Sequence, residues 1–254
     1  MDIATVLGLV LGIGALLGSF LMEGGHLGAL IQVPAMLLVI LGTFGATVVT
    51  TSLTQIKSLP EIIKIAAFEK RLHPQQLIEF IYELAQKARK NGLLSLEKDL
   101  AGIREPFLKK ALQLAIDGFE TNKIKEILEI EMSYVEERHK SGAAFFQKMG
   151  GFSPTLGIMG TVLGLIHALS NLENSSNIAS SIAGAFIATL WGVALANLIY
   201  LPISDKLKAR HQDEGLCLEI ITEGVISLAM GDNPRVIRMK LLSFLIPDMR
   251  TEED

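Results

Sequence analysis

The chain has 254 residues, of which 50% are hydrophobic and only 20% are charged, and its formal net charge at pH 7 is −4. Soluble globular domains carry about 25% charged residues, so the composition indicates a membrane protein, and the small negative charge excludes an electrostatic surface for nucleic acid. The single cysteine, Cys217, excludes an intrachain disulfide framework.

The N-terminal block, residues 1–56, contains no Lys or Arg. An apolar stretch of about 20 residues can cross the roughly 30 Å hydrocarbon core of a bilayer as a helix. This block holds two uncharged stretches of that length, separated by Glu23-Gly24-Gly25-His26. We therefore predict transmembrane helices near residues 3–21 and 29–51.

A charged segment, residues 57–148, follows and holds 16 of the 23 Lys and Arg residues. Apolar residues at helical spacing predict a helix that begins at Pro74 and ends at Asn91. A second helix is predicted to restart directly after Ser95, which would act as its N-cap. A third is predicted to run from Thr121 into the next membrane segment without interruption. The apolar face of the first of these helices consists of Leu77, Ile78, Ile81, Leu84, Ala85 and Ala88.

The block of residues 149–205 again lacks Lys and Arg, and it predicts membrane helices near residues 150–170 and 180–202. Pro154 and Pro202 lie at the predicted cytoplasmic ends of these helices. Because proline has no N–H group and disfavours an unbroken helix, two interpretations stay open. Each proline is a helix end or kink, or it is a hinge that couples the membrane part to the cytoplasmic part.

The other seven Lys and Arg residues lie in residues 206–254, where a helix is predicted over Glu214–Met230. Cytoplasmic segments carry an excess of Lys and Arg, so both basic segments and both termini are predicted to be cytoplasmic. The predicted fold is all-α, a polytopic membrane protein with four transmembrane helices (2+2) and a helical cytoplasmic domain. The alternative is a soluble protein that buries one apolar block as a pair of core helices. The predicted domains are residues 1–56 (first hairpin), 57–148 (cytoplasmic helical domain), 149–205 (second hairpin) and 206–254 (C-terminal cytoplasmic helices).

The sequence contains no phosphate-binding P-loop, no H-E-x-x-H motif and no Cys/His cluster, so no enzyme, cofactor or metal site is predicted. The four predicted membrane helices also contain no Asp, Glu, Lys or Arg. Their one titratable candidate is His167, with Tyr200 near the inner end. Proteins that move ions usually carry ionisable residues inside the membrane. If this chain moves ions, we therefore expect the ion-binding carboxylate to come from another subunit.

Small residues recur at four-residue spacing in three of the predicted membrane helices, which allows backbones to approach closely. Two interpretations stay open: tight packing within one subunit, or contact with helices of neighbouring subunits. The positions are Gly8, Gly12, Gly14, Gly18, Gly160, Gly164, Gly184, Ala188, Gly192 and Ala196.

Four segments resemble the flagellar motor stator A subunits, the MotA/PomA family. Ser153–Leu165 is similar to the signature of that family's third membrane helix, and Ala188–Asn197 to the signature of its fourth. Arg89–Glu97 resembles the cytoplasmic torque region, and Gly231–Arg235 resembles the C-terminal turn. The four segments occur in the family's order, and the resemblance covers nearly the whole chain.

The resemblance implies a stator subunit of the bacterial flagellar motor. Five copies would surround two single-span helices of a MotB/PomB-like B subunit, which would supply the ion-binding aspartate. Ion flow would turn the ring of A subunits and drive the rotor protein FliG. The complex would lie in the bacterial inner membrane, in contact with lipid.

The resemblance also implies roles for individual residues. Arg89 and Glu97 match the charged pair that engages the rotor, although each also suits the helix end at which it is predicted to lie. Pro154 and Pro202 match the family's two functional prolines. The implied pore-lining residues are Thr155, Thr161 and Thr189.

The resemblance further bears on the ion. Sodium-driven members tend to have two adjacent threonines where this chain has Ala188-Thr189. A hard cation prefers several oxygen ligands, so the missing hydroxyl favours protons. His167 is then interpreted as a packing residue rather than a proton relay.

Two other functions stay open. An ExbB/TolQ-like proton-channel subunit that energises envelope transport shares the pattern of the third and fourth helices, but such proteins have three spanning helices. A self-sufficient transporter or membrane enzyme is the third possibility, and the missing membrane carboxylates disfavour it.

Overall fold

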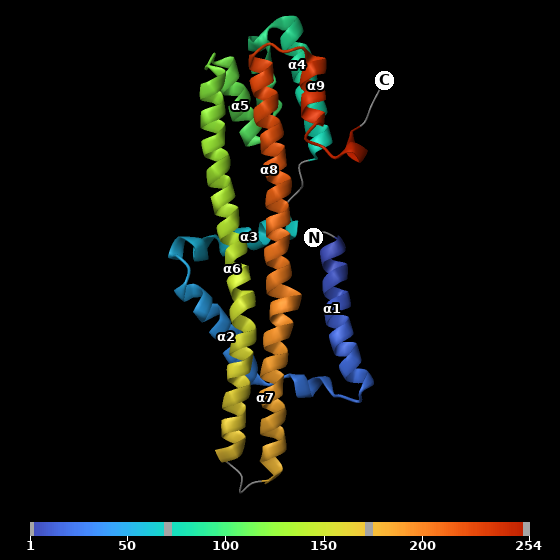
Figure 1. Ribbon diagram of the computed structural model, residues 1–254, viewed down its shortest axis with the longest axis vertical. Coiled ribbons are helices and arrows are strands. Elements are labelled where there is room, and N and C mark those ends of the chain that lie inside the picture. The colour runs from blue at the N-terminus through green and yellow to red at the C-terminus, as the bar shows by residue number, and fades with distance from the viewer. Residues whose placement is uncertain (1–2, 69–72, 171–174, 251–254) are drawn as a thin grey trace. The chain divides into compact units, whose positions relative to one another are not determined.

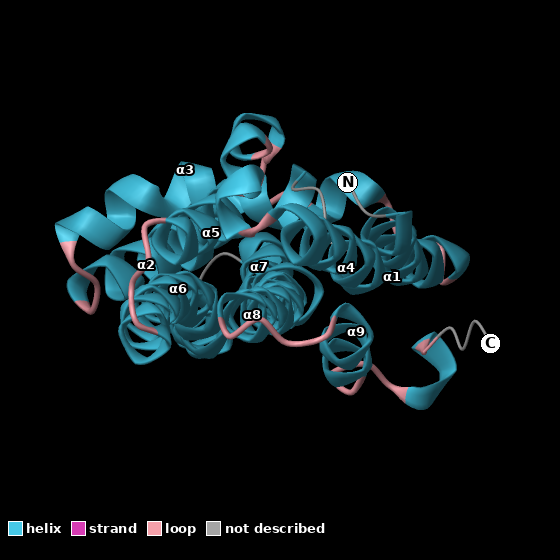
Figure 2. Cartoon of the chain, turned by 90° about the horizontal axis from the view of Figure 1, so that it is seen from above, coloured by secondary structure: helices cyan, strands magenta, loops and turns pink. Residues whose placement is uncertain are grey.

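The computed structural model describes residues 3–68, 73–170 and 175–250. Every regular element within these ranges is helical, which confirms the all-α prediction (Figures 1 and 2). In chain order, the elements are α1 (Ile3–Met22), η1 (Leu27–Leu30), α2 (Val33–Val49), α3 (Leu53–Phe68), α4 (Pro74–Asn91), η2 (Leu93–Lys98), η3 (Leu100–Gly102), α5 (Pro106–Ile116), α6 (Thr121–Ser170), α7 (Ser175–Leu195), η4 (Ala196–Tyr200), α8 (Leu201–Ala229), α9 (Pro234–Leu242) and η5 (Pro247–Met249).

The chain divides into two compact units. The first unit comprises Met1–Glu69 and His139–Lys208, and the second comprises Lys70–Arg138 and Ala209–Asp254. Two helices, α6 and α8, contribute residues to both units.

The first unit contains the apolar helices. Among the described residues, three helical stretches are long and apolar enough to cross a membrane: Ile3–Met22, and the stretches Thr121–Ser170 and Ile178–Ala229, which extend into the second unit. The apolar helix α2 has 17 residues, which at 1.5 Å per residue is about 25 Å and is short for a hydrocarbon core of roughly 30 Å. It begins at Val33, later than predicted, because Pro34 lies in its first turn, where proline is favoured.

The helix predicted to run from Thr121 into the membrane segment is confirmed, because α6 continues without interruption to Ser170. Pro154 therefore lies inside a helix and does not end one. The connection between the helices predicted near residues 150–170 and 180–202 falls partly in residues 171–174, outside the described residues, and α7 begins at Ser175, earlier than predicted.

The start of the C-terminal helix predicted over Glu214–Met230 is wrong, because α8 already begins at Leu201. The chain stays helical from α7 through η4 to the end of α8 at Ala229, so Pro202 is not a helix end either. The η4 segment is a π-helix, in which the N–H of Leu201 donates to the carbonyl of Ala196, five residues earlier. The wider π turn closes at Leu201, just before Pro202, which has no N–H group. The helix continues past this proline.

The second unit has its own apolar core, formed by α4, η2, α5 and the adjoining parts of α6, α8 and α9. The predicted apolar face of α4 is confirmed: Leu77, Ile78, Ile81, Leu84 and Ala85 are buried, and Ala88 is half-buried against the same core. At the end of α8, Gly231 has a φ of 76°, and Asn233 caps α9 by accepting a hydrogen bond from the N–H of Arg235 at 3.0 Å. This closure agrees with the turn predicted at the end of the helix.

The helix predicted directly after Ser95 is wrong. Residues Leu93–Lys98 and Leu100–Gly102 form short 3₁₀ turns. The Ser95 hydroxyl donates to the carbonyl of Gly92 at 2.7 Å, so it does not act as an N-cap acceptor. The next α-helix begins only at Pro106, where the carboxylate of Glu105 accepts a hydrogen bond from the N–H of Phe107.

Candidate functional site

Helices α6 and α7 approach each other at backbone distance in the first unit. A Cβ atom added to Gly157 would lie 2.9 Å from the carbonyl oxygen of Ala188, and one added to Gly192 would lie 2.7 Å from the carbonyl oxygen of Ser153. The buried Ser153 hydroxyl also donates to the carbonyl of Gly192 at 2.8 Å. Only glycine leaves room for this contact.

Most of the small-residue stripe on these two helices packs within the chain itself. Gly160 faces the methyl group of Ala188, and Gly164 faces Ala185. The Gly184 backbone lies against the Gln32 side chain. On α1 the pattern differs, because only Gly12 has a described neighbour within 4 Å of its added Cβ, and Gly8, Gly14 and Gly18 face open space.

Two of the three predicted pore threonines meet at this contact. The Thr161 hydroxyl on α6 is hydrogen-bonded to the Thr189 hydroxyl on α7. Thr161 Oγ1 also lies 3.0 Å from the carbonyl oxygen of Ala185, and Thr189 Oγ1 lies 3.2 Å from that of Gly157. Both side chains are half-buried. Since a hydroxyl donates once and accepts up to twice, each can hydrogen-bond a further group without leaving a donor unpaired.

The other predicted membrane residues are placed separately from this pair. Thr155 is exposed and donates to the carbonyl of Phe152 at 2.7 Å, within its own helix. Pro154 is half-buried inside α6, and Pro202 is exposed directly after the π turn. His167 is exposed in the last turn of α6.

Sequence reasoning missed a polar link between the first hairpin and α7. The indole Nε1 of Trp191 donates to the carbonyl oxygen of Leu30 at 2.8 Å. Trp191 is the one tryptophan of the chain, and a buried indole usually finds a hydrogen-bond acceptor, so its presence in an aliphatic helix was the available signal. A second missed contact joins Lys148 Nζ to the carbonyl oxygen of Thr50 at 2.8 Å.

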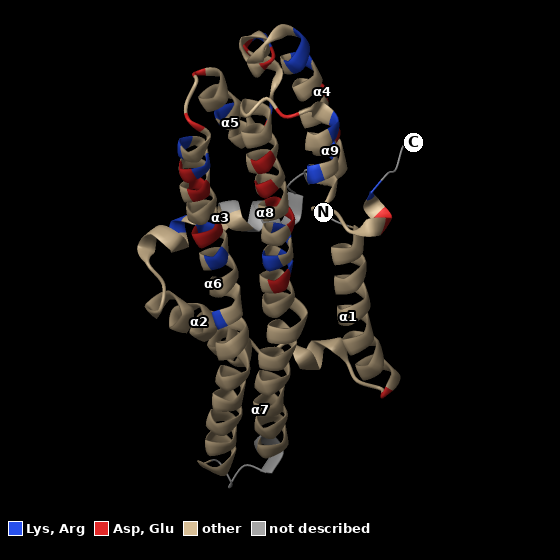
Figure 3. Ribbon diagram, turned by 45° about the horizontal axis from the view of Figure 1, so that its top comes forward, with Lys and Arg blue, Asp and Glu red and all other residues tan. Residues whose placement is uncertain are grey.

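The charges follow the helices as the sequence predicts. Figure 3 shows charged residues on the first part of α6 and on α8, whereas the described residues of α1, α2 and α7 include none. Among the described residues, no group of three or more His, Cys, Asp and Glu side chains could hold a metal ion. The membrane helices therefore offer hydroxyl and carbonyl oxygens, but no carboxylate.

The second predicted site lies in the second unit, where α4 ends. Arg89 is exposed in the last turn of α4, and its Nη1 donates to the carbonyl oxygen of Gly231 at 3.2 Å. Gly92 then turns the chain with a φ of 82°. Glu97 follows on η2, where its side chain is exposed. The structure thus places both predicted charges on one short α4–η2 connection.

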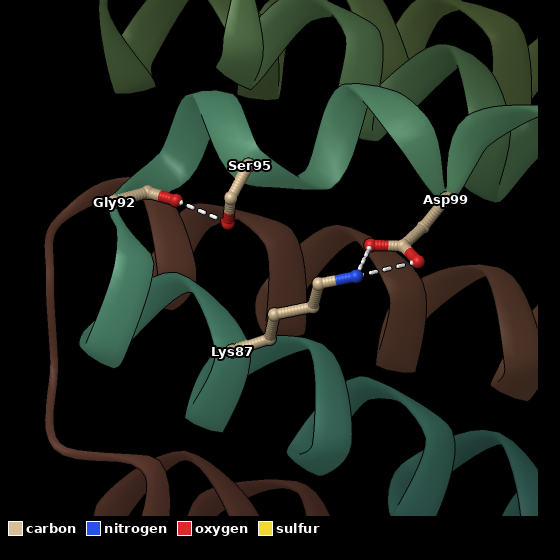
Figure 4. Close-up of polar contacts among 4 residues, drawn as sticks. All are labelled: Lys87, Gly92, Ser95 and Asp99. Carbon is tan, nitrogen blue, oxygen red and sulfur yellow. Dashed lines mark hydrogen bonds and ion pairs between the residues drawn. The ribbon is translucent and has the colours of Figure 1, made fainter.

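An ion pair that sequence reasoning missed closes this connection (Figure 4). Lys87 Nζ on α4 lies 2.8 Å from Oδ1 and 2.6 Å from Oδ2 of Asp99, which follows η2. The side chains are 40% and 32% exposed. A separation of 12 residues across a turn gave no sequence signal, because the pairing depends on how η2 folds back onto α4.

Comparison with known proteins agrees with this architecture. Residues 6–92 match the model of the motility protein A N-terminal family, and residues 99–219 match that of the MotA/TolQ/ExbB proton channel family. Motility protein A of Borreliella burgdorferi is 34% identical over 99% of this chain and 97% of its own length. Motility protein A of Bacillus subtilis is 37% identical over 96% of this chain and 91% of its own length. A solved structure titled "Structure of C. jejuni MotAB" superposes with a TM-score of 0.93 at 33% identity, covering 98% of this chain and 97% of that one.

Proposed function

This chain belongs to the motility protein A family, and on that premise we propose how it works as a stator subunit of the bacterial flagellar motor. It is a membrane protein and not an enzyme, and it acts together with a MotB-like B subunit, as the solved MotAB complexes suggest. The two subunits form an ion channel whose ion flow drives torque on the rotor. The ExbB/TolQ-like alternative is not favoured, because the matched relatives are motility proteins.

One observation carries this proposal. Residues 3–22, 27–56, 149–172 and 174–204 contain no Asp, Glu, Lys or Arg. A chain that conducts ions through such helices needs an ionisable group from elsewhere, so the B subunit supplies the ion-binding aspartate. The channel is therefore completed only when both subunits are present.

The ion path runs along Thr155, Thr161 and Thr189. The Thr161–Thr189 pair supports this role, because its hydroxyls are only half-buried and retain acceptor capacity toward a passing proton carrier. The transported ion is the proton. Ala188 is 1% exposed and its methyl group faces Gly160, so a second threonine there would have no room for the oxygen ligand that a sodium ion prefers.

Pro154 and Pro202 couple ion binding to movement. Each interrupts the α-helical hydrogen-bond ladder of a helix that continues past it. The π turn before Pro202 supports this role, because π segments inside helices are frequent at functional sites. One charge that crosses the membrane releases about 2.3 kcal/mol per 100 mV, which is several times RT and can bias such a step.

Arg89 and Glu97 engage the rotor protein FliG. This role is supported by the exposure of both side chains at the α4–η2 connection of the second unit. Charges at exposed positions steer association and fix register more than they add affinity. Opposite charges on the rotor are the expected partners.

The remaining architecture follows the positions of the charges and apolar residues. We propose four spans in the bacterial inner membrane, with both termini in the cytoplasm and the domain boundaries predicted from the sequence. Five copies surround the B subunit, with lipid outside. No residue of α1 is buried within the chain, which supports contacts of α1 with lipid and with neighbouring copies.

Ion flux measurements test the proposal. Vesicles that contain this chain with its B subunit should conduct protons, and vesicles with this chain alone should not. Swimming speed at fixed pH should not depend on external sodium. Proton flux through the chain alone, or swimming that scales with sodium, would contradict it.

A further inference from the structure

The Lys87–Asp99 ion pair lies beside the two charges proposed to contact the rotor. Asp99 comes two residues after Glu97, and Lys87 comes two residues before Arg89. Both carboxylate oxygens of Asp99 lie within 2.8 Å of Lys87 Nζ (Figure 4). The pair thus ties the far end of η2 to the last turns of α4, across the connection that presents Arg89 and Glu97.

Because of the 3₁₀ geometry, the ion pair also determines the direction in which the neighbouring side chains point. With three residues per turn, residues three apart share one face. Leu96 is fully buried, and Asp99, three residues later, lies on the same face and reaches α4. Glu97 and Lys98, the two residues between them, are exposed. The ion pair therefore fixes which face of the 3₁₀ turn lies against α4, and so which side chains are exposed.

The register of the turn matters for the proposed rotor contact because Lys98 follows Glu97 directly. Lys98 carries the opposite charge, so a one-residue rotation that turns Glu97 inward would leave a cation exposed without the acid. The buried apolar residues alone do not determine the rotation of the turn. Leu96 and Leu100 are both buried, but they are four residues apart and so do not lie on one face of a 3₁₀ helix. An ionic contact from Asp99 distinguishes the two registers, since only one of them brings Asp99 to Lys87.

We propose that Lys87 and Asp99 are positioning residues, which hold the 3₁₀ turn in the register that keeps Glu97 exposed together with Lys98. This inference rests on the proposed rotor contact and adds the device that orients it. Neither residue needs to touch the rotor. When Asp99 is neutralised, Lys87 is free to turn to Glu83, four residues earlier on the same helix, where such pairs form readily.

Hydrogen–deuterium exchange on the complete complex with the B subunit tests the structural half. Lys87→Gln and Asp99→Asn should exchange the amides of residues 93–102 roughly two- to fivefold faster, the range that a partly exposed ion pair supports. The swap Lys87→Asp with Asp99→Lys should return exchange to the parental rate. The matched control is Lys110→Gln, which removes another ion pair of the second unit, to Glu131, and should leave these amides unchanged.

Swimming tests the functional half. Both neutral variants should swim at less than half the parental speed, with unchanged abundance in the membrane and unchanged proton flux. The swap should restore swimming. So should Lys98→Glu added to Asp99→Asn, because either register then presents an acid, and a merely structural role would not respond to that exposed charge. Lys87→Gln alone carries the test if the Asp99→Asn variant does not assemble.

Unchanged exchange, normal swimming despite faster exchange, or no rescue by the swap and by Lys98→Glu would each overturn the inference. The exchange measurement does not depend on any rotor contact. Normal swimming of Arg89→Glu and Glu97→Lys would instead contradict the proposed rotor contact itself, so the two failures are distinguishable.

Discussion

The hydroxyl of Thr161 on α6 is hydrogen-bonded to the hydroxyl of Thr189 on α7, and both lie within 3.3 Å of the carbonyl oxygen of Gly157. This cluster places three oxygen atoms where α6 and α7 are in backbone contact. Polar atoms are otherwise sparse along these helices, so the cluster supplies hydrogen-bond partners for the proposed proton path.

Replacing Thr189 by Val removes the hydroxyl and keeps the shape. We expect proton flux through the two-subunit channel to fall about tenfold, the factor that corresponds to roughly 1.4 kcal/mol of lost stabilisation. Folding should suffer less, because interhelical hydrogen bonds in membranes contribute about 0.6 kcal/mol on average. The control is Ser170→Ala, whose hydroxyl bonds only to its own helix at Ile166. Parental flux in Thr189→Val would contradict the assigned path.

Gly157→Ala should prevent the close approach of α6 and α7. Its new methyl group would meet backbone atoms of Ala188, Thr189 and Gly192 at 2.9–3.2 Å, which no rotamer change relieves. We expect a loss of about 1–3 kcal/mol, as overpacked cores show, and a clear drop in assembled complex on blue-native gels. Gly151→Ala, on the same helix with nothing within 4 Å, should assemble normally. Equal behaviour of the two variants would show that the backbone contact is unimportant.

Charge reversal at Arg89 or Glu97 should abolish swimming while insertion into the membrane and proton flux stay at parental levels. The reason is that both side chains are exposed, as the proposed rotor contact requires, and Arg89 makes only a surface hydrogen bond to the carbonyl oxygen of Gly231 within the chain. Soft-agar motility and immunoblots of the membrane fraction measure the two properties. Lys109→Glu, an exposed charge on α5, serves as the control and should swim. A swimming Arg89→Glu strain would remove the basis for the rotor contact.

Pro202→Ala should make the helix that runs from α7 through η4 into α8 more regular. The alanine N–H can donate to the carbonyl of Leu198, four residues earlier, which favours an α-helical turn over the π turn at Ala196–Tyr200. An interior proline costs a helix about 3 kcal/mol, so we expect higher thermal stability together with lost motility. Pro106→Ala, at the first turn of α5 where proline is well tolerated, should change neither. A less stable or normally motile Pro202→Ala variant would argue against a coupling role.

Cys217 should be chemically silent in the folded protein. Burial raises the pKa of its thiol to about 11 from an ordinary value of 9.0, and the charges of Asp213, Glu105 and Glu214 act in the same direction. The neutral thiol is therefore favoured by folding. Its contribution, at most about 3 kcal/mol, is complete below pH 9 and is lost as the pH rises from 9 toward 11.

Maleimide labelling at pH 8 should detect Cys217 only after denaturation. The midpoint temperature of unfolding should decrease as the pH rises from 9 to 11. In Cys217→Ala this part of the pH dependence should be missing. An exposed cysteine introduced as Lys109→Cys in that background should label at once. Rapid labelling of native Cys217 would mean that the core of the second unit opens.

The helices of this protein were largely predictable because they depend on local properties. Uncharged runs predicted α1 and the membrane part of α6, and apolar periodicity predicted α4. The errors arose where a local signal competed with packing. Ser95 reads as an N-cap, but the burial of Leu96 and Leu100 in the core folds that segment into 3₁₀ turns. Pro202 reads as a helix end, but the π turn lets the helix continue.

The sequence by itself determined the membrane character, the all-α class and the lack of a membrane carboxylate, because each follows from residue type and spacing along the chain. Only the tertiary structure decided that Thr161 meets Thr189, that Ala188 faces Gly160 and that Lys87 pairs with Asp99. These contacts join residues 12 to 28 positions apart on different elements, and their geometry depends on how closely and in which rotation the elements pack, which no local pattern encodes.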